Sequence, residues 1–375
     1  MTHETNIPLR QIGAEIALRS TLIAFSRAMW DLRTLGAQEL PPGPCFIYGN
    51  HSNNYDPFIL NAFTGLGQGT AGVMTMEYLE RGLTAAIFRS AGIEGTRKRV
   101  PEPHLVRRIA KLLENGRRIV IFPEGGRRWD GRPAPWIEST AKVFQRMGVP
   151  VYPVRIHGSY LSWPRWARWP RPASVGVEVC PPVPLTRSMS LPDVLCALRA
   201  PIAADENLVD PSFAPPWAFR PADGLERLVY RDLATGTFNG LRVEKGNRIV
   251  SEDGITTWRV GADSCLETAQ HARMTSAHAY DAVRAMPLLP APDGTLIEHM
   301  AWVQGEAVTV RLSATHAAIG DLIVPLEDIR FMGLERSDRL WLIGKDMHVY
   351  CTFPDGCSVL AWYDTLARLA PHINS

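Results

Sequence analysis

The stretch YGNHSNNYDPF, residues 48–58, places a histidine and an aspartate five positions apart behind the short apolar run CFI. A carboxylate that binds one nitrogen of an imidazole fixes the tautomer and leaves the other nitrogen able to take a proton. His51 follows the apolar run, and Asp56 precedes Pro57 and a second apolar run, so both side chains can occupy one strand-to-helix turn. The pair is a candidate for activating a nucleophile. The alternative is a polar turn that closes a buried strand, since this spacing alone is common.

A second candidate cluster follows the apolar run IVIF at residues 119–122 and reads PEGGR. Its two glycines allow a ligand to approach the backbone closely, and the planar guanidinium of Arg127 matches the geometry of a phosphate. The alternative is a tight turn that carries a solvated arginine, and the residues by themselves favour this alternative.

A third cluster is GSYLSWPRWARWPRPA, residues 158–173, in which Trp163, Trp166 and Trp169 alternate with arginines between prolines. Indole rings and cationic side chains both occur in the headgroup layer of a membrane. The composition therefore favours membrane contact by these three tryptophans. The alternative is a proline-rich loop that folds over the core.

The elements that would position these residues follow an alternating pattern over residues 44–184. Predicted strands lie at CFIYGNH, AGVMTM, RRIVIFPEG, VPVYPVRI and ASVGVEVCPPVPL, and EPHLVRRIAKLLENG predicts a helix with Leu105, Ile109 and Leu112 on one face. Such alternation predicts an α/β layer fold with a largely parallel sheet. Ligands in this class bind beyond the carboxyl ends of the strands, which is where GNH and PEG both fall.

The rest of the chain predicts further parts: an amphipathic helix at 1–34, a domain at 35–200, a proline-rich linker at 201–224 and a β-rich region at 225–375, with a small meander at 225–265 and a second module at 285–375. In the helix, the apolar stripe is Leu9, Ile12, Ile16, Ile23 and Trp30. This stripe either anchors the chain at a membrane interface or packs on the protein's own core.

Charge is distributed unevenly over the 375 residues. Residues 1–200 hold 25 Lys and Arg against 15 Asp and Glu, whereas the remainder holds 15 against 23. A basic first part favours anionic partners such as phosphate groups, lipid headgroups or an acidic carrier protein. Nucleic acid is not expected, because the sequence has no zinc finger and no basic helix pattern.

Composition also restricts the location of the protein. The six cysteines form no C-x-x-C pair, so neither a disulfide framework nor a zinc site is expected. The start MTHETNIPLR lacks the pattern of a secretory signal, and the uncharged residues 57–76 are interrupted by TGLGQGT. We therefore expect a protein on the cytoplasmic face of a membrane, attached peripherally and without a spanning helix.

Three motifs in order, NHSNNYD at 50–56, FPEGGR at 122–127 and VPVYPV at 149–154, resemble the signatures of the glycerolipid acyltransferase family, typified by lysophosphatidic acid acyltransferases. AGIEGTR at 91–97 resembles the acceptor block of the family more loosely. The resemblance covers about residues 35–190 and implies a layered αβα acyltransferase fold. One departure is Gly126, which stands where the family often has Ser or Thr.

The resemblance implies a role for each matching residue. His51 would be the general base and Asp56 its orienting partner. The acceptor and its phosphate would be bound by Glu124, Gly125 and Arg127, together with Arg97. Because the block that ends at Arg97 matches loosely, two alternatives stay open: Arg99 is the phosphate contact, or neither arginine is. The implied reaction, part of phospholipid biosynthesis, moves a fatty acyl group from acyl-CoA or acyl-carrier protein, as co-substrate, to a lysophospholipid hydroxyl, without cofactor or metal.

The C-terminal region resembles known modules only weakly. Its first part has the rhythm of a zinc ribbon, but Asp232 and Thr235 stand where the first cysteine pair would be, so no metal is expected. The strands after Glu306 and the segment SVLAWYDTLARL resemble a pleckstrin-homology-like module. Without a basic patch, lipid binding by this region does not follow.

Two alternatives to the lysophospholipid reaction stay open. The acceptor hydroxyl can belong to another lipid, such as an aminolipid or a glycolipid. A protein of a different class would bind lipid or carrier protein without catalysis. The presence of both His51 and Asp56 favours an enzyme, because a pure binding protein has no need of a proton acceptor.

Overall fold

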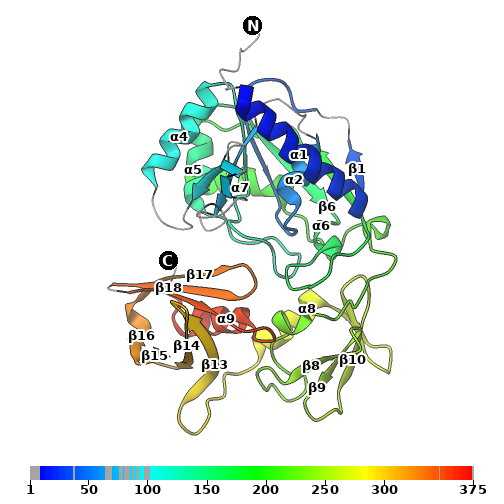
Figure 1. Cartoon of the computed structure of the whole chain (residues 1–375), viewed down its shortest axis with the longest axis vertical. Helices are drawn as coiled ribbons and strands as arrows, with labels where there is room; N and C mark the ends of the chain where they lie inside the picture. The colour runs from blue at the N-terminus through cyan, green and yellow to red at the C-terminus, as the bar shows by residue number, and fades with distance from the viewer. Residues whose placement is uncertain are drawn as a thin grey trace. The chain divides into compact units, whose positions relative to one another are not determined.

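The computed structural model describes residues 9–36, 39–63, 70–75, 79, 85–86, 88–89, 93–96, 102–345 and 347–373 (Figure 1). The chain forms two compact units, one made of residues 1–164 and 171–216, the other of residues 165–170 and 217–375. A six-residue piece of the Trp-rich segment thus belongs to the second unit, and the chain passes between the units at three points.

The first unit is built on a seven-stranded sheet with the strand order β1-β7-β6-β2-β5-β3-β4. The strands are β1 (Asp31–Leu35), β2 (Phe46–Gly49), β3 (Thr70–Thr75), β4 (Ile93–Thr96), β5 (Arg118–Ile121), β6 (Val151–His157) and β7 (Ser174–Val179). Neighbouring strands are parallel except β6 and β7, which are antiparallel. The largely parallel sheet confirms the predicted α/β class.

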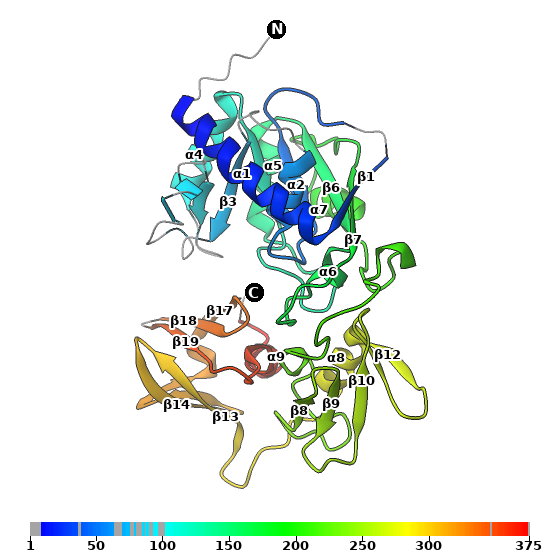
Figure 2. The ribbon, with the colours of Figure 1, turned by 45° about the vertical axis from the view of Figure 1, so that its right-hand side comes forward.

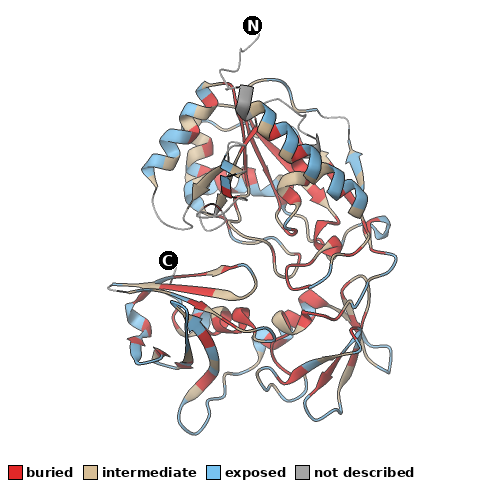
Figure 3. Ribbon diagram, in the orientation of Figure 1, coloured by how far each residue is buried: buried red, intermediate tan, exposed pale blue. Residues whose placement is uncertain are grey.

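Helices cover both faces of this sheet (Figures 1 and 2). They are α1 (Leu9–Met29), α2 (Asp56–Phe63), α4 (Pro103–Glu114), α5 (Glu138–Met147) and α7 (Leu191–Arg199). Because successive side chains of a strand point to opposite faces, Phe46 of β2 packs with Phe144 of α5, whereas Ile47 packs with Ile59 of α2. Figure 3 shows the buried central strands and the exposed outer sides of α1 and α4.

The predicted apolar stripe of α1 is only partly buried: Trp30, which directly follows the helix, is buried, whereas Ile12 and Ile23 are half-buried. Glu15 and Arg19 are buried, whereas Ile16 and Phe25 are 38% and 41% exposed. The buried charges are paired: Arg19 lies 3.9 Å from Glu15, and Glu15 also binds the buried Arg117. Pairing offsets the cost of removing these charges from water, so the helix can present apolar residues outward.

Two predicted boundaries differ from the structure. The N-terminal helix predicted for residues 1–34 ends at Met29, because residues 31–35 form β1 and pair with β7. The predicted linker 201–224 belongs to the first unit as far as Pro216. This part contains the short helices η2 (Ala200–Ile202) and η3 (Pro211–Phe213), and its buried side chains include Ile202, Glu206 and Phe213.

The second unit is rich in antiparallel strands, as predicted for residues 225–375. A five-stranded sheet, in the order β12-β11-β10-β9-β8, contains β8 (Leu241–Glu244), β9 (Arg248–Ser251), β10 (Thr257–Val260), β11 (Cys265–Glu267) and β12 (Arg273–Thr275). A seven-stranded sheet, in the order β16-β15-β14-β13-β19-β18-β17, contains β13 (Thr295–Val303), β14 (Glu306–Ser313), β15 (His316–Ile319), β16 (Leu322–Pro325), β17 (Ile329–Glu335), β18 (Arg339–Gly344) and β19 (His348–Thr352). The helical segments are η4 (Leu225–Arg227), α8 (Ser276–Ala285), η5 (Leu326–Asp328) and α9 (Val359–Leu369). The likeness to a zinc ribbon and to a pleckstrin-homology-like module stays a prediction.

Candidate active site

The site begins where β2 ends, at the centre of the sheet between β5 and β6. Gly49, the last residue of β2, permits close packing here, because a Cβ would lie 2.8 Å from the carbonyl oxygen of Val154 on β6. The chain then turns through His51 and enters α2 at Asp56. The backbone N–H of Arg128, in the loop after β5, donates a hydrogen bond of 2.7 Å to the carbonyl oxygen of His51. The two motif loops therefore meet at the carboxyl edge of the sheet.

The structure brings His51 and Asp56 together within this turn. The Nδ1 atom of the imidazole lies 3.0 Å from Oδ2 of the carboxylate. The side chain of His51 is 17% exposed, and that of Asp56 is fully buried. The imidazole also stacks on Phe122, with 4.4 Å between the ring centroids. With a carboxylate as its partner, Nδ1 carries the ring proton, and Nε2 is the nitrogen that can accept another.

The Asp56 carboxylate has a hydrogen bond at each oxygen. The backbone N–H groups of Ser52 and Asn53 donate to Oδ2 at 2.7 and 2.8 Å. The hydroxyl of Ser159 donates to Oδ1, from the short helix α6 (Ser159–Ser162) that follows β6. A buried carboxylate held from several sides cannot turn away, so it fixes the orientation of the imidazole.

Glu124, predicted to bind the acceptor, is paired with Arg128 inside the protein. The Nε atom of Arg128 donates to Oε2 of Glu124 at 3.0 Å, and Nη2 donates to Oε1 at 2.6 Å. At most 1% of either side chain is exposed. Burial raises the pKa of the Glu124 carboxyl, and the guanidinium of Arg128 opposes that rise. To contact an acceptor directly, the Glu124 carboxylate would have to break its hydrogen bonds with Arg128.

The other predicted acceptor residues have different surroundings. Gly125 has a φ of +67°, in the left-handed region, and a Cβ at this position would collide with the side chain of Ile137. The turn itself therefore requires glycine, whatever binds nearby. Arg127 is half-buried. Arg97 and the alternative Arg99 lie outside the described residues.

A buried carboxylate that the sequence analysis missed, Glu206, completes the cluster. Its Oε1 accepts hydrogen bonds from Nδ2 of Asn50, at 3.1 Å, and from the hydroxyl of Ser52. Its Oε2 accepts from the backbone N–H of Tyr160 at 2.7 Å, and Nη1 of Arg128 lies 3.7 Å from Oε1. Complete burial raises the pKa of Glu206 to about 7, although Arg128 and these hydrogen bonds oppose the rise.

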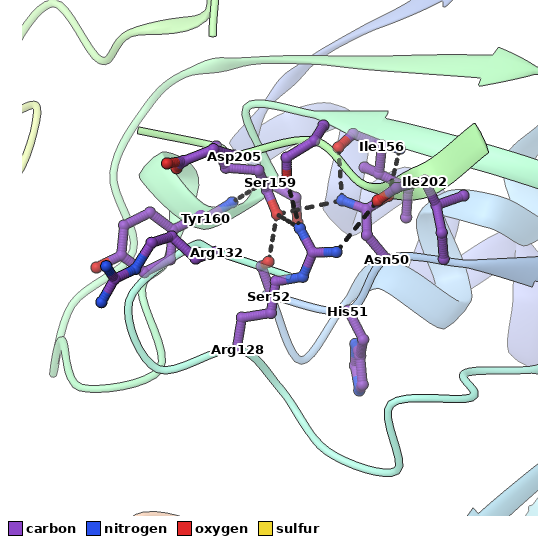
Figure 4. Close-up of polar contacts among 12 residues, drawn as sticks. Asn50, His51, Ser52, Arg128, Arg132, Ile156, Ser159, Tyr160, Ile202 and Asp205 are labelled. Atoms are coloured by element: carbon purple, nitrogen blue, oxygen red, sulfur yellow. Dashed lines mark hydrogen bonds and ion pairs between the residues drawn. The ribbon is translucent and has the colours of Figure 1, made fainter. Parts of the chain in front are cut away.

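Figure 4 shows how the turn presents its side chains. Asn50 and Ser52 point toward the guanidinium of Arg128, and the imidazole of His51 points the opposite way. Three residues here escaped the sequence analysis: Arg128, Ser159 and Glu206. The doubled arginine of GGRR was a signal for the first, but Ser159 lies 103 residues from Asp56, and Glu206 lies 154 residues from Ser52.

The three tryptophans predicted to contact a membrane lie in different environments. Trp163 is half-buried and stacks on Tyr55, with 5.9 Å between ring centroids. Trp169 is 45% exposed. Trp166 is fully buried in the second unit, so its inclusion in one exposed Trp-rich surface is wrong: its apolar area packs inside the protein. For Trp163 and Trp169, membrane contact stays a prediction. Among the described helices, none is long and apolar enough to cross a bilayer.

The described part of the chain contains no group of three or more His, Cys, Asp and Glu side chains that could hold a metal ion.

Comparison with known proteins gives partial matches. The family model described as Acyltransferase matches residues 31–157. The 1-acyl-sn-glycerol-3-phosphate acyltransferase of Pseudomonas aeruginosa is 25% identical over 140 residues, which cover 36% of this chain and 53% of the relative. The protein of that name from Limnanthes alba is 23% identical over 137 residues, 36% of this chain and 48% of the relative. The chain thus spans about half the length of these curated relatives.

Solved structures give a distant match. The crystal structure of the 1-acyl-sn-glycerophosphate (LPA) acyltransferase PlsC from Thermotoga maritima aligns with 18% identity and a TM-score of 0.40, over 53% of this chain and 84% of that one.

Proposed function

The chain carries an acyltransferase domain like that of the lysophosphatidic acid acyltransferases, and we propose that it moves a fatty acyl group from acyl-CoA or acyl-carrier protein to a lysophospholipid hydroxyl. The observation that carries the proposal is the arrangement of His51 and Asp56. The imidazole is partly exposed, and Nδ1 lies 3.0 Å from a buried carboxylate that hydrogen bonds fix in place.

The proposed reaction begins with removal of a proton. Nε2 of His51 takes the proton of the acceptor hydroxyl as that oxygen attacks the carbonyl carbon of the thioester. The negative Asp56 stabilises the imidazolium that forms. The tetrahedral intermediate then collapses: the carbon–sulfur bond breaks, and the leaving thiolate takes the proton from Nε2. The products are an ester and a free thiol, and His51 returns to its neutral state.

Binding of the acceptor phosphate is proposed for Arg127, with Arg97 as the second cation. A guanidinium matches two phosphate oxygens at once. Arg127 directly precedes Arg128, whose backbone N–H binds the carbonyl oxygen of His51. Glu124 then contributes through Arg128, by fixing the loop that carries Arg127, and Gly125 contributes by allowing the turn.

Peripheral attachment to the cytoplasmic face of a membrane is the third part of the proposal, and α1 supports it. The helix keeps Glu15 and Arg19 on its buried side and exposes Ile16 and Phe25. Phe25 stacks on Tyr55 with 5.0 Å between ring centroids, and Tyr55 is the neighbour of Asp56. An apolar surface thus continues toward the catalytic turn, where exclusion of water favours transfer over hydrolysis.

Membrane attachment is tested by sedimentation with vesicles that contain anionic phospholipid. Replacing both Ile16 and Phe25 by aspartate should reduce the bound fraction of the protein strongly. Val106→Asp, at an equally exposed apolar residue of α4, is the control for each of the single variants Ile16→Asp and Phe25→Asp, because it adds the same one negative charge. Equal binding by the single variants and the control would contradict the role of α1.

The reaction itself is tested by measuring thiol release from acyl-CoA with and without lysophosphatidic acid. An acyltransferase releases thiol at a rate that depends on the acceptor. A hydrolase releases thiol without acceptor, and a binding protein releases none. Running the same assay with an aminolipid and a glycolipid, and with acyl-carrier protein as donor, identifies the acceptor and the donor. Absence of acceptor-dependent release with every pair would refute the proposal.

A further inference from the structure

We propose that Glu206 is a positioning residue: its buried carboxylate binds Asn50 and Ser52, the two neighbours of His51, and so fixes the turn that carries the histidine. This role rests on the proposed function of His51. Glu206 lies in the segment that its prolines predicted to be a linker, beyond the family match that ends at residue 157. The inference therefore concerns a residue that the matched motifs do not contain.

Side chains alternate in direction along the turn that carries His51. Asn50 and Ser52 both point inward and donate to the same oxygen, Oε1 of Glu206. His51, between them, points outward (Figure 4). Asn50 is fixed further because its amide donates to the carbonyl oxygen of Ile156 and accepts from the N–H of Ile156, each at 2.8 Å. Holding two residues on one side fixes the direction in which the residue between them points.

Glu206 and Asp56 hold the same short helix, α6. Glu206 accepts from the backbone N–H of Tyr160, and Asp56 accepts from the hydroxyl of Ser159, the preceding residue. The carboxylate that orients the imidazole and the carboxylate behind the turn are thus joined through α6. Movement of Glu206 would shift the frame that supports both His51 and Asp56.

The partners of the Glu206 carboxylate are hydrogen-bond donors. Each group that the structure pairs with the Glu206 carboxylate presents a hydrogen: the amide of Asn50, the hydroxyl of Ser52, the N–H of Tyr160, and the cation of Arg128 at 3.7 Å. A carboxylate can accept from all of them. Glutamine has the same shape, but its NH₂ group would face a donor in either orientation, so at least one buried group would lose its partner.

The test compares Glu206→Gln with Asp210→Asn in the full chain, using acyl-CoA and lysophosphatidic acid. The control changes an exposed carboxylate of the same segment to an amide. For Glu206→Gln, we expect kcat to fall about tenfold to hundredfold, because a small displacement of a catalytic group costs rates of this order. The KM for each substrate should change by less than about twofold, since ground-state binding is untouched. The control should keep the wild-type values.

A second readout does not depend on turnover. In protein labelled with ¹⁵N-histidine, the Nδ1–H signal of His51 is assigned by its loss in His51→Asn. The signal should broaden or shift in Glu206→Gln and stay in place in Asp210→Asn. If it moves while no variant or wild type transfers acyl groups, the proposed function fails and the positioning role stands.

The positioning role is overturned if folded Glu206→Gln keeps both the wild-type kcat and the wild-type His51 signal. The positioning role is also overturned if kcat falls and KM rises by similar factors while the Nδ1–H signal of His51 stays unchanged. Should Glu206→Gln not fold, Ser52→Ala replaces it, because this change removes one of the hydrogen bonds and little volume. That variant is expected to lose several-fold in kcat, and an unchanged kcat would contradict the proposal.

Discussion

Replacing Arg128 by methionine removes the cation that joins the loop after β5 to the interior of the first unit. The guanidinium donates to both oxygens of Glu124, to the carbonyl oxygens of Ile202 and Ala204 at 3.2 and 2.8 Å, and lies 3.7 Å from Glu206. Methionine fills much of the same space without the charge. Two buried carboxylates would then lack their cation, and breaking a buried pair in this way costs about 3–5 kcal/mol.

The measurement is urea unfolding of the full chain, followed by tryptophan fluorescence. We expect the free energy of unfolding to fall by about 3–5 kcal/mol in Arg128→Met. The matched control is Arg33→Met, because Arg33 pairs with Asp31 at the surface, where the two side chains are 45% and 60% exposed. The control should lose less than about 1 kcal/mol, since water screens an exposed pair.

A double variant separates the charge from the volume. Adding Glu124→Gln to Arg128→Met removes one of the two buried carboxylates that lack a cation, and it should restore part of the lost free energy of unfolding. The reasoning is refuted if Arg128→Met loses no more stability than Arg33→Met. It is also refuted if Glu124→Gln lowers the free energy of unfolding by the same amount in Arg128→Met as in the wild type, because the two side chains would then not interact.

Three other variants extend these expectations. The folded-state pKa of Glu206 is about 7, above its ordinary value of 4.5, so its stabilising contribution is complete below pH 4.5 and is lost as the pH rises through 7. Between pH 5 and 8, the free energy of unfolding of the wild type should therefore fall by about 3 kcal/mol relative to Glu206→Gln, and parallel curves would contradict this. Asp56→Asn keeps the shape but removes the charge that stabilises the imidazolium, so kcat should fall by roughly 10²-fold or more in a thiol-release assay, and a wild-type rate would contradict this. Ending the chain at Pro216 removes the partners of residues 165–170 and exposes Trp166, so the truncated protein should have a red-shifted tryptophan fluorescence and aggregate, unlike the full chain.

Local patterns predicted most of the first unit. The apolar runs at β2, β5, β6 and β7 and the helix α4 are short, continuous signals, and the strands and helix lie where these signals predicted. His51 and Asp56 lie in one turn, so their contact follows from local geometry once strand and helix are known. The prediction that GNH and PEG both lie at the carboxyl ends of strands depended only on recognising a largely parallel sheet.

Long-range partners explain what could not be predicted. The burial of Glu15 on α1 depends on its pairing with Arg117, a residue 102 positions away, which the apolar pattern of the helix cannot show. The prolines between residues 201 and 224 predicted a linker. Composition alone cannot show that Glu206 of this segment binds buried hydrogen-bond donors. Burial of Trp166 was hidden for the same reason: its surroundings belong to the second unit.

Production of phosphatidic acid from lysophosphatidic acid and acyl-CoA, measured by mass spectrometry for wild type and His51→Ala, tests the central claim most directly. We expect product from the wild type and a rate lower by roughly 10²–10⁴-fold in the folded variant, because the general base is absent. Equal product formation by the two proteins would contradict the assignment of His51 and, with it, the proposed mechanism.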